Sequence, residues 1–181
     1  MKYSILIKGI AVHQKYETGI VRKRDGIMNL HFCEVTPDNW RAVAALEVAQ
    51  GQQQFIESNA FSLAESLYEK KGTSIGLYDG EILVGYAMYG WYSETEESVW
   101  LDRFMIDHKC QGKGYAKRFL MLLIEHFQQI YNCKKVYLSL HPENKLAMKI
   151  YESFGFRLTG KIDDSGPVVG VVMELLLNKE S

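Results

Sequence analysis

The stretch Val99–Ala116, VWLDRFMIDHKCQGKGYA, decides the fold of this chain. Its first half, Val99–Ile106, carries the aromatic and β-branched residues of a buried strand. Asp107–Lys109 ends that strand, and Gln111–Ala116 follows as a loop with two glycines two positions apart. Glycines at this spacing let the backbone turn tightly and point several N–H groups at one spot. The stretch therefore predicts a strand, a tight loop and a helix.

The start of the predicted helix adds to the anion-binding character of this loop. The first N–H groups of a helix have no partner within it, and the helix dipole is positive there. Such a site most often binds a phosphate. The loop is not a P-loop, because no Lys-Ser or Lys-Thr follows a GxxxxG pattern, and it lacks the third glycine of a dinucleotide-binding GxGxxG. By itself, however, the GxG pattern is as compatible with an ordinary turn.

Composition places the chain among soluble globular proteins. With 181 residues, 47% hydrophobic and 24% charged, it can form one domain with a sizeable core. No apolar run approaches the roughly 20 residues of a membrane span. The three cysteines are scattered, and neither they nor the five histidines have metal-ligand spacing. We therefore expect a cytoplasmic protein with no metal site and no membrane partner.

The net charge of −1 is unevenly distributed along the sequence. Residues 1–27 carry a charge of +4, which leaves −5 for the remainder. A mildly acidic body argues against nucleic acid as a partner and is compatible with a cationic substrate. The same charge could equally serve solubility alone.

Turn signals and hydrophobic periodicity divide the chain after residue 28 into helices and strands. Thr36-Pro37-Asp38 predicts a helix start, and Asp79-Gly80 predicts a hairpin turn. We expect helices over 36–49, 61–70, 116–130 and 144–154, and strands over 29–35, 74–78, 81–91, 99–106, 135–140, 156–162 and 168–177. This order predicts a mixed sheet with helices on both faces, in the α/β or α+β class.

Residues 1–27 are the hardest segment to place. The apolar piece Ile5–Ile7 is too short for the core of a signal peptide. We expect a dispensable extension of unknown role, followed by a domain over residues 28–181. The alternative is a hairpin or arm that packs on a partner.

Two motifs together resemble the acetyl-coenzyme A core of the GCN5-related N-acetyltransferase (GNAT) superfamily. The first is the Gln-x-x-Gly-x-Ala spacing that begins at Gln111. The second motif lies further along the chain and consists of five residues at characteristic positions: Asn144, Ala147, Tyr151, Gly155 and Phe156. The resemblance covers about residues 29–177 and implies a mixed, mostly antiparallel central sheet of about six to seven strands. It also implies an acetyltransferase that uses acetyl-CoA as cosubstrate.

Four shorter stretches resemble the bacterial spermine/spermidine N-acetyltransferases, at residues 54–58, 84–90, 99–104 and 137–139. This narrower resemblance implies transfer of the acetyl group to a primary amine of a polyamine, by direct attack in a ternary complex. Two alternatives stay open. One is acetylation of another small amine, an aminoglycoside or a protein N-terminus. The other is a non-catalytic acyl-CoA-binding module. A homodimer is expected by analogy with the superfamily only.

The resemblance also implies how acetyl-CoA is held. After Gln111, the pyrophosphate would be bound by main-chain N–H groups of Gly112, Lys113, Gly114, Tyr115 and Ala116. The pantetheine arm would lie along a splayed central strand and pair with Phe104, Met105 and Ile106, where one N–H can polarise the thioester carbonyl. Asn144 matches a pantetheine-binding position, and it can also cap the helix that follows it.

Two residues are candidates for proton transfer. Tyr151 matches the family's usual general acid, which protonates the departing thiolate; spacing alone would rather suggest a core tyrosine. Asp102 lies where related polyamine enzymes place a carboxylate, and we expect it to act as a base or to hold a water. A structural hydrogen bond is an equal alternative for Asp102. Because neighbours in a strand point to opposite faces, an ion pair between Asp102 and Arg103 is not expected.

A polyamine needs spaced carboxylates for its separated ammonium groups. Glu57, in the break between the first two helices, is the best candidate together with Asp102. Glu94, Glu96 and Glu97 are weaker candidates, because a run of acids in a loop is usually a solvated surface.

Overall fold

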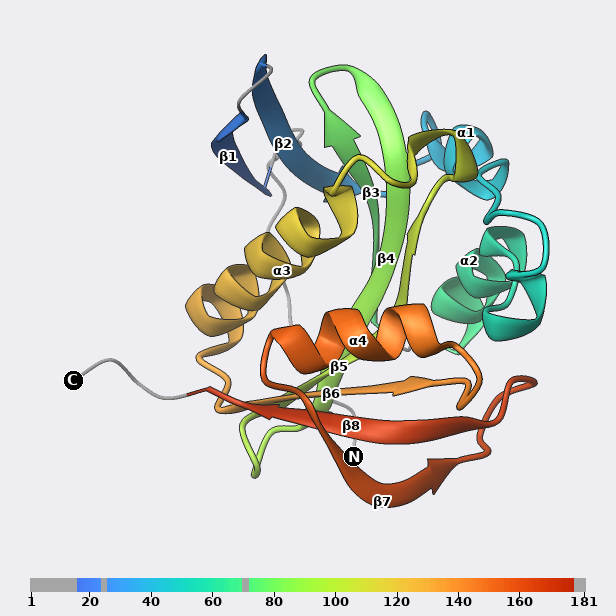
Figure 1. Cartoon of the computed structure of the whole chain (residues 1–181), viewed down its shortest axis with the longest axis vertical. Coiled ribbons are helices and arrows are strands. Elements are labelled where there is room, and N and C mark those ends of the chain that lie inside the picture. Colours follow the sequence, from blue (N-terminus) through green and yellow to red (C-terminus); the bar gives the residue numbers. More distant parts are fainter. Residues whose placement is uncertain (1–15, 24–25, 70–71, 178–181) are drawn as a thin grey trace.

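The computed structural model describes residues 16–23, 26–69 and 72–177. Its described strands form one sheet of eight in the order β1-β2-β3-β4-β5-β6-β8-β7 (Figure 1). Strands β5 and β6 are parallel, and the other neighbouring pairs are antiparallel. The strands are β1 (Tyr16–Lys23), β2 (Gly26–Glu34), β3 (Thr73–Asp79), β4 (Ile82–Ser93), β5 (Ser98–Ile106), β6 (Lys135–Leu140), β7 (Arg157–Asp163) and β8 (Gly170–Leu176).

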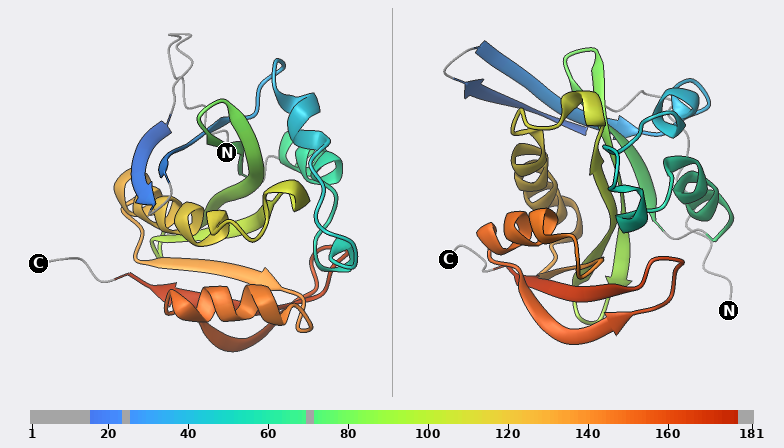
Figure 2. Two further views of the ribbon diagram at one scale, coloured as in Figure 1. Left: turned by 45° about the horizontal axis from the view of Figure 1, so that its top comes forward. Right: turned by 45° about the vertical axis from the view of Figure 1, so that its right-hand side comes forward.

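Helices cover both faces of this sheet, as the sequence predicts (Figure 2). They are α1 (Trp40–Ala44), α2 (Asn59–Tyr68), α3 (Tyr115–Tyr131) and α4 (Lys145–Ser153), with short 3₁₀ turns at Gln53–Phe55 and His108–Cys110. None of the helices in the described residues is long and apolar enough to cross a membrane. The mixed, mostly antiparallel sheet with helices on both faces is thereby confirmed.

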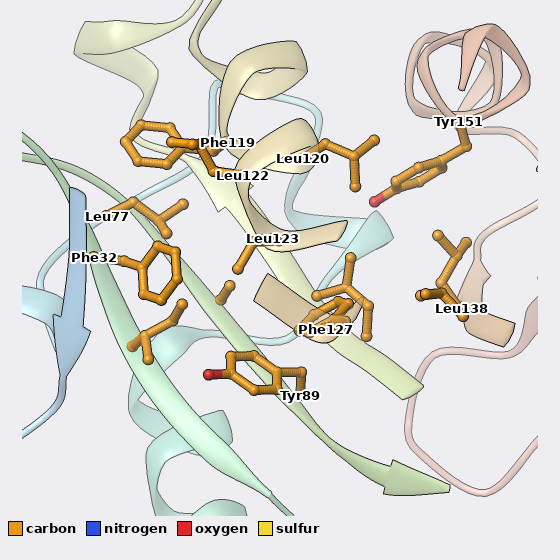
Figure 3. Close-up of a cluster of buried hydrophobic side chains, with 14 of the residues drawn as sticks. Phe32, Leu77, Tyr89, Phe119, Leu120, Leu122, Leu123, Phe127, Leu138 and Tyr151 are labelled. Carbon is orange, nitrogen blue, oxygen red and sulfur yellow. The ribbon is translucent and has the colours of Figure 1, made fainter. Parts of the chain in front are cut away.

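The larger of two hydrophobic clusters joins α3 and α4 to one face of the sheet. Phe119 and Phe127 of α3 are fully buried, and Leu138 of β6 and Tyr151 of α4 belong to the same cluster. Figure 3 shows these side chains together with Phe32 of β2. The periodic apolar residues of α3 therefore pack inward, at the spacing that the sequence indicates. A smaller cluster on the other face joins Val43 of α1 to strands β4 and β5.

The sheet divides between its two parallel strands. β5 pairs with β4 along its whole length, from Ser98 to Ile106. It pairs with β6 only over Ser98–Leu101, opposite residues 135–138. Beyond that point β6 stays with β8, while β5 stays with β4. A gap therefore opens along residues 102–106 of β5.

The first predicted helix is wrong at both ends, because α1 begins at Trp40 and not at Thr36, and it ends at Ala44 and not near Ala49. The chain that follows is held by main-chain contacts to the end of β5. The N–H of Glu47 donates to the Asp107 carboxylate over 3.2 Å, and the N–H of His108 donates to the Glu47 carbonyl over 2.8 Å. These two bonds pull residues 45–50 out of the helix and onto the loop after β5.

The predicted domain boundary at residue 28 falls inside β2. Residues 16–23 form β1, an edge strand that pairs antiparallel with β2. This strand is the eighth of the sheet; six of the others lie wholly in the predicted domain, and β2 lies in it from Met28 onward. Residues 1–15 lie outside the described residues. That residues 1–27 are dispensable stays a prediction.

We predict that Gly85→Ala destabilises the fold by about 2 kcal/mol, because overpacking a tight site costs this order of energy. A Cβ at Gly85 in β4 would clash with the main-chain carbonyl of Met105 in β5, which cannot move without breaking the ladder. Gly166→Ala is the matched control, since its Cβ would meet only Glu57 Oε1 at an ordinary 3.5 Å. Urea unfolding measures both variants. A Gly85→Ala protein as stable as the control would contradict this reading of the β4–β5 contact.

Candidate functional site

A cavity of about 520 Å³ occupies the gap between β5 and β6. The glycine loop after β5 closes one end of it, and α4 forms a side wall. The opposite end is lined by residues from the α1–α2 connection, α2, β5 and the β7–β8 loop. Apart from Lys113 and the weaker candidates Glu94, Glu96 and Glu97, the site residues that the sequence predicts all line this cavity. They come from four separate stretches of the chain: Glu57, Asp102, Phe104, Met105, Ile106, Gln111, Gly112, Gly114, Tyr115, Ala116, Asn144 and Tyr151.

The main chain of Phe104 faces the gap. Successive residues of a strand point their N–H and C=O groups to opposite edges. The N–H of Asp107 donates to Val84 of β4, so Met105 and Asp107 point their main-chain groups at β4, and Phe104 and Ile106 point the other way. The Ile106 carbonyl accepts from the Gln111 side chain over 3.1 Å. An extended ligand with amide groups can therefore form hydrogen bonds with the main chain of Phe104, whereas Met105 only lines the cavity.

The glycine loop presents its main chain to the cavity. Gly112 and Gly114 have φ angles of +76° and +81°, the left-handed region that only glycine enters without strain. Gly114 is the N-cap of α3 and has no side chain to fill the helix N-terminus. The Arg118 guanidinium donates to the carbonyl of Gly114 over 3.0 Å, which engages a loop carbonyl and leaves the N–H groups to a ligand. This is the geometry of an anion site.

Three side chains of this loop and of the start of α3 form hydrogen bonds within the protein. Lys113 Nζ donates to the Lys109 carbonyl over 3.0 Å, so the lysine folds back onto the loop. The Tyr115 hydroxyl donates to Asp79 over 2.8 Å, and burial together with that carboxylate raises the pKa of Tyr115 to about 12. Gln111 donates to Gln52 over 2.9 Å as well as to Ile106. These residues therefore offer main-chain groups to a ligand rather than free side chains.

Asn144 caps α4 through its side chain, which accepts a hydrogen bond from the Ala147 N–H over 3.2 Å. Tyr151, two turns further along α4, is 8% exposed and points from α4 toward α3, against Phe156 (Figure 3). Burial raises the pKa of the Tyr151 hydroxyl above its ordinary value. Tyr151 thus lines the cavity as a protonated hydrogen-bond donor at neutral pH.

The expectation that Asp102 and Arg103 do not pair is wrong. Arg103 Nη1 lies 3.4 Å from Asp102 Oδ1 and 3.0 Å from the Asp102 carbonyl. The cause is a β-bulge. Of two consecutive residues in β4, Met88 pairs with Arg103 and Tyr89 pairs with Leu101, so Asp102 is an extra residue in β5. A bulge interrupts the alternation of faces, so neighbouring side chains can meet.

Arg103 gathers two further carboxylates at the same end of the cavity. Its Nε lies 3.0 Å from Glu57 Oε2, and its Nη2 donates to Glu65 Oε2 over 2.9 Å. Glu57 is thus where the sequence places it, but it already faces a cation. The Asp102 side chain is the most exposed of the three carboxylates, at 27%.

Sequence reasoning missed Glu65, Arg103 and Asp163 as residues of this site. Burial alone would raise the pKa of Asp163, but hydrogen bonds from Ser139 and Ser165, with Arg103 nearby, hold that pKa below its usual value. No sequence signal marks Asp163, because it is one of several polar residues where β7 ends and a turn of ordinary composition begins. Glu94, Glu96 and Glu97 lie in the β4–β5 turn and do not line the cavity. Among the described residues, no group of three His, Cys, Asp or Glu side chains is arranged so that it could hold a metal ion.

The cavity has two ends of opposite chemical character. The loop end offers main-chain N–H groups and Lys117, and suits an anion. The other end carries four carboxylates against the single guanidinium of Arg103, and suits a cation: Glu57, Glu65, Asp102 and Asp163. The free edge of β5 connects the two ends.

Comparisons with known proteins agree with this geometry. The model of the acetyltransferase (GNAT) family matches residues 40–156. A spermine/spermidine N(1)-acetyltransferase of Bacillus subtilis is 40% identical over 149 residues, which are 80% of this chain and 98% of that protein. Among solved structures, the chain resembles the spermidine N-acetyltransferase of Vibrio cholerae in complex with CoA and spermine, with a TM-score of 0.64 and 20% identity over 81% of this chain and 95% of that one. A dodecameric structure of the Vibrio enzyme has a TM-score of 0.61 at 20% identity, over 84% of this chain and 98% of that one.

The family match spans both predicted motifs, the glycine loop and the Asn144–Phe156 segment, and the structure brings the two motifs to one cavity. The identity to the Bacillus protein extends over nearly its whole length. The chain belongs to the GNAT family of acetyltransferases.

Proposed function

We propose that this protein is an N-acetyltransferase that transfers the acetyl group of acetyl-CoA to a primary amine of a polyamine such as spermidine or spermine. The observation that carries the proposal is the single cavity that joins an anion-binding loop to a carboxylate cluster along a free strand edge. The loop suits the pyrophosphate of the cosubstrate, and the carboxylates suit the ammonium groups of the acceptor. The 40% identity to the Bacillus spermine/spermidine enzyme supports the same acceptor.

The cosubstrate would lie along β5. The N–H groups from Gly112 to Ala116 would hold the pyrophosphate, and the main chain of Phe104 would pair with the amides of the pantetheine arm. Ile106 adds an N–H on the same edge. A main-chain N–H aimed at the thioester oxygen stabilises the charge that develops there when the amine attacks. Asn144 contributes chiefly by fixing the start of α4, since its side chain is engaged as the helix cap.

Two protons move in the reaction, and one residue is proposed for each. The attacking amine must lose a proton, and Asp102 would accept it directly or through a water. The thiolate of coenzyme A must gain a proton, and the buried Tyr151 hydroxyl would donate it. The thioester bond breaks as the amide bond forms, so no covalent intermediate with the enzyme is needed.

Glu57, Glu65 and Asp163 would receive the ammonium groups of the polyamine that do not react. They lie on different elements around the acidic end of the cavity, and Gly166 of the β7–β8 loop approaches Glu57. Spaced carboxylates of this kind favour an acceptor with several charges over a monoamine.

We further propose that the protein works in the cytoplasm as a homodimer. Its three cysteines are free thiols, which suits a reducing compartment. The dodecameric structure of the Vibrio relative supports self-association in general. Analytical ultracentrifugation measures the assembly directly.

The first test is coenzyme A release with acetyl-CoA and a panel of acceptors. Spermidine and spermine are expected to be turned over with the highest kcat/KM, above butylamine, an aminoglycoside and a peptide with a free N-terminus. The physical reason is the excess of carboxylates at the acceptor end. Binding of acetyl-CoA without turnover of any polyamine would overturn the proposed acceptor, and preference for the aminoglycoside or the peptide would replace it.

Tyr151→Phe is expected to lower kcat by about 100-fold, the usual range for loss of a general acid. Binding of acetyl-CoA, measured by calorimetry, should stay unchanged because the ring remains. Tyr86→Phe is the matched control, since Tyr86 is also buried but its hydroxyl forms a hydrogen bond with Ser74 outside the cavity. The raised pKa keeps the Tyr151 hydroxyl protonated as pH rises. Ionisation of Tyr151 should therefore cause no loss of wild-type rate at any pH up to about 10. An equal loss in both variants would remove Tyr151 from the proposed mechanism.

Gly114→Ala is expected to weaken acetyl-CoA binding by at least about tenfold, since left-handed strain of this kind costs about 1–3 kcal/mol. Its Cβ would also clash with the Arg118 guanidinium and push it off the loop carbonyl. Gly112→Ala suffers the same kind of strain, but its Cβ meets nothing within 4 Å. Calorimetry should therefore rank Gly114→Ala as the weaker binder. The reverse ranking would argue against a role for Arg118 in shaping the loop.

A further inference from the structure

Arg103 is a cation placed inside a site that we propose for a cationic substrate. Its side chain is only 11% exposed and lies at the acidic end of the cavity. It faces three carboxylates within 3.4 Å, on the α1–α2 connection, on α2 and on β5: Glu57, Glu65 and Asp102. One guanidinium against three carboxylates leaves a net charge of −2 on this group.

The three contacts of Arg103 differ in kind. The Nη2 contact to Glu65 is a hydrogen bond of 2.9 Å and fixes the guanidinium on α2. The Nη1 group is held by the carbonyl of Asp102 at 3.0 Å. The Nε contact to Glu57 is an ion pair at 3.0 Å without hydrogen-bond alignment. Because a misaligned contact is weaker, Glu57 is the carboxylate that can most easily exchange Arg103 for another cation.

We propose that Arg103 is a specificity-determining residue, a built-in counter-ion that sets how strongly the site demands several positive charges from its substrate. This inference rests on the proposed function. By neutralising part of the cluster, Arg103 weakens the attraction for a distal ammonium group, which must compete with it for Glu57. A monoamine has no distal ammonium, so its binding depends little on Arg103.

The charge of the cluster can be changed in both directions. Arg103→Met removes the cation and keeps an unbranched apolar side chain in place of the aliphatic part of arginine, which takes the net charge to −3. Glu65→Gln removes a carboxylate and keeps an oxygen that can accept the Nη2 hydrogen bond, which takes the net charge to −1. Arg103→Lys keeps the positive charge and loses the planar guanidinium with its several N–H donors. Arg41→Met is the matched control, since Arg41 is exposed on α1 and lies over Trp40.

The readout is the ratio of kcat/KM for spermidine to kcat/KM for butylamine in each variant. One buried charge a few ångströms away is expected to change this ratio by about tenfold. The ratio should rise by that factor in Arg103→Met and fall by it in Glu65→Gln, through KM for spermidine rather than through kcat. It should stay near the wild-type value in Arg103→Lys and Arg41→Met.

A purely structural role for Arg103 would lower kcat for both amines and leave the ratio unchanged, and this result would overturn the inference. If Arg103→Met fails to fold, Glu65→Gln decides, because an unchanged ratio there overturns it equally. If the wild type turns over no polyamine, the proposed function fails by itself. The inference then depends on the shift in melting temperature that spermidine produces, which must grow in Arg103→Met and shrink in Glu65→Gln.

Discussion

The divergence of two parallel strands is the constraint on which the rest of this structure depends. β5 and β6 share hydrogen bonds only as far as Leu101 and Leu138, and each then stays with its antiparallel neighbour. A sheet that separates in this way would ordinarily leave unpaired main-chain groups and an empty wedge. Here the cluster that includes Phe127, Leu138 and Tyr151 packs α3 and α4 across the division and holds the two halves of the sheet together. The cavity is therefore a consequence of topology rather than of any one side chain.

The bulge at Asp102 decides what the cavity contains at its acidic end. An unbulged β5 would direct Asp102 and Arg103 to opposite faces of the sheet. The extra residue lets both side chains meet at the α1–α2 connection and α2, where Glu57 and Glu65 complete the cluster. The same network also joins α2 to β5, so the wall of the acidic end and its charge depend on the same contacts. Stability and charge are thereby difficult to change independently at this end of the protein.

The sequence predicted local elements well where periodicity and turn residues agreed. β6 and α3 lie at or within one residue of the expected bounds, because α3 has a clear apolar face and β6 is a short buried run. The length of α1 was not predictable, since its true end is set by bonds from Glu47 to residues beyond β5, about 60 positions away in sequence. The alternation of side chains along a strand likewise could not predict the bulge at Asp102, because the bulge depends on how β5 pairs with β4.

The candidate site was predictable from motifs to a similar degree. The glycine loop, Tyr151 and Asn144 have fixed local spacings, and the fold brings them to one cavity. Glu65 and Asp163 were missed because only tertiary contacts distinguish them from surface acids. Their membership of the site follows from the position of α2 and of the β7–β8 loop, which no local pattern encodes.

The open edge of β5 has a consequence for how such a protein can change over time. Its recognition groups are the N–H and C=O of the main chain, which every residue except proline carries alike. Exchanging side chains along this edge therefore leaves its hydrogen-bonding pattern in place. The acidic end, in contrast, is composed of individual carboxylates that single substitutions alter. In a protein with this architecture, single substitutions can therefore change the charge at the acidic end of the cavity while the main-chain groups along β5 stay the same.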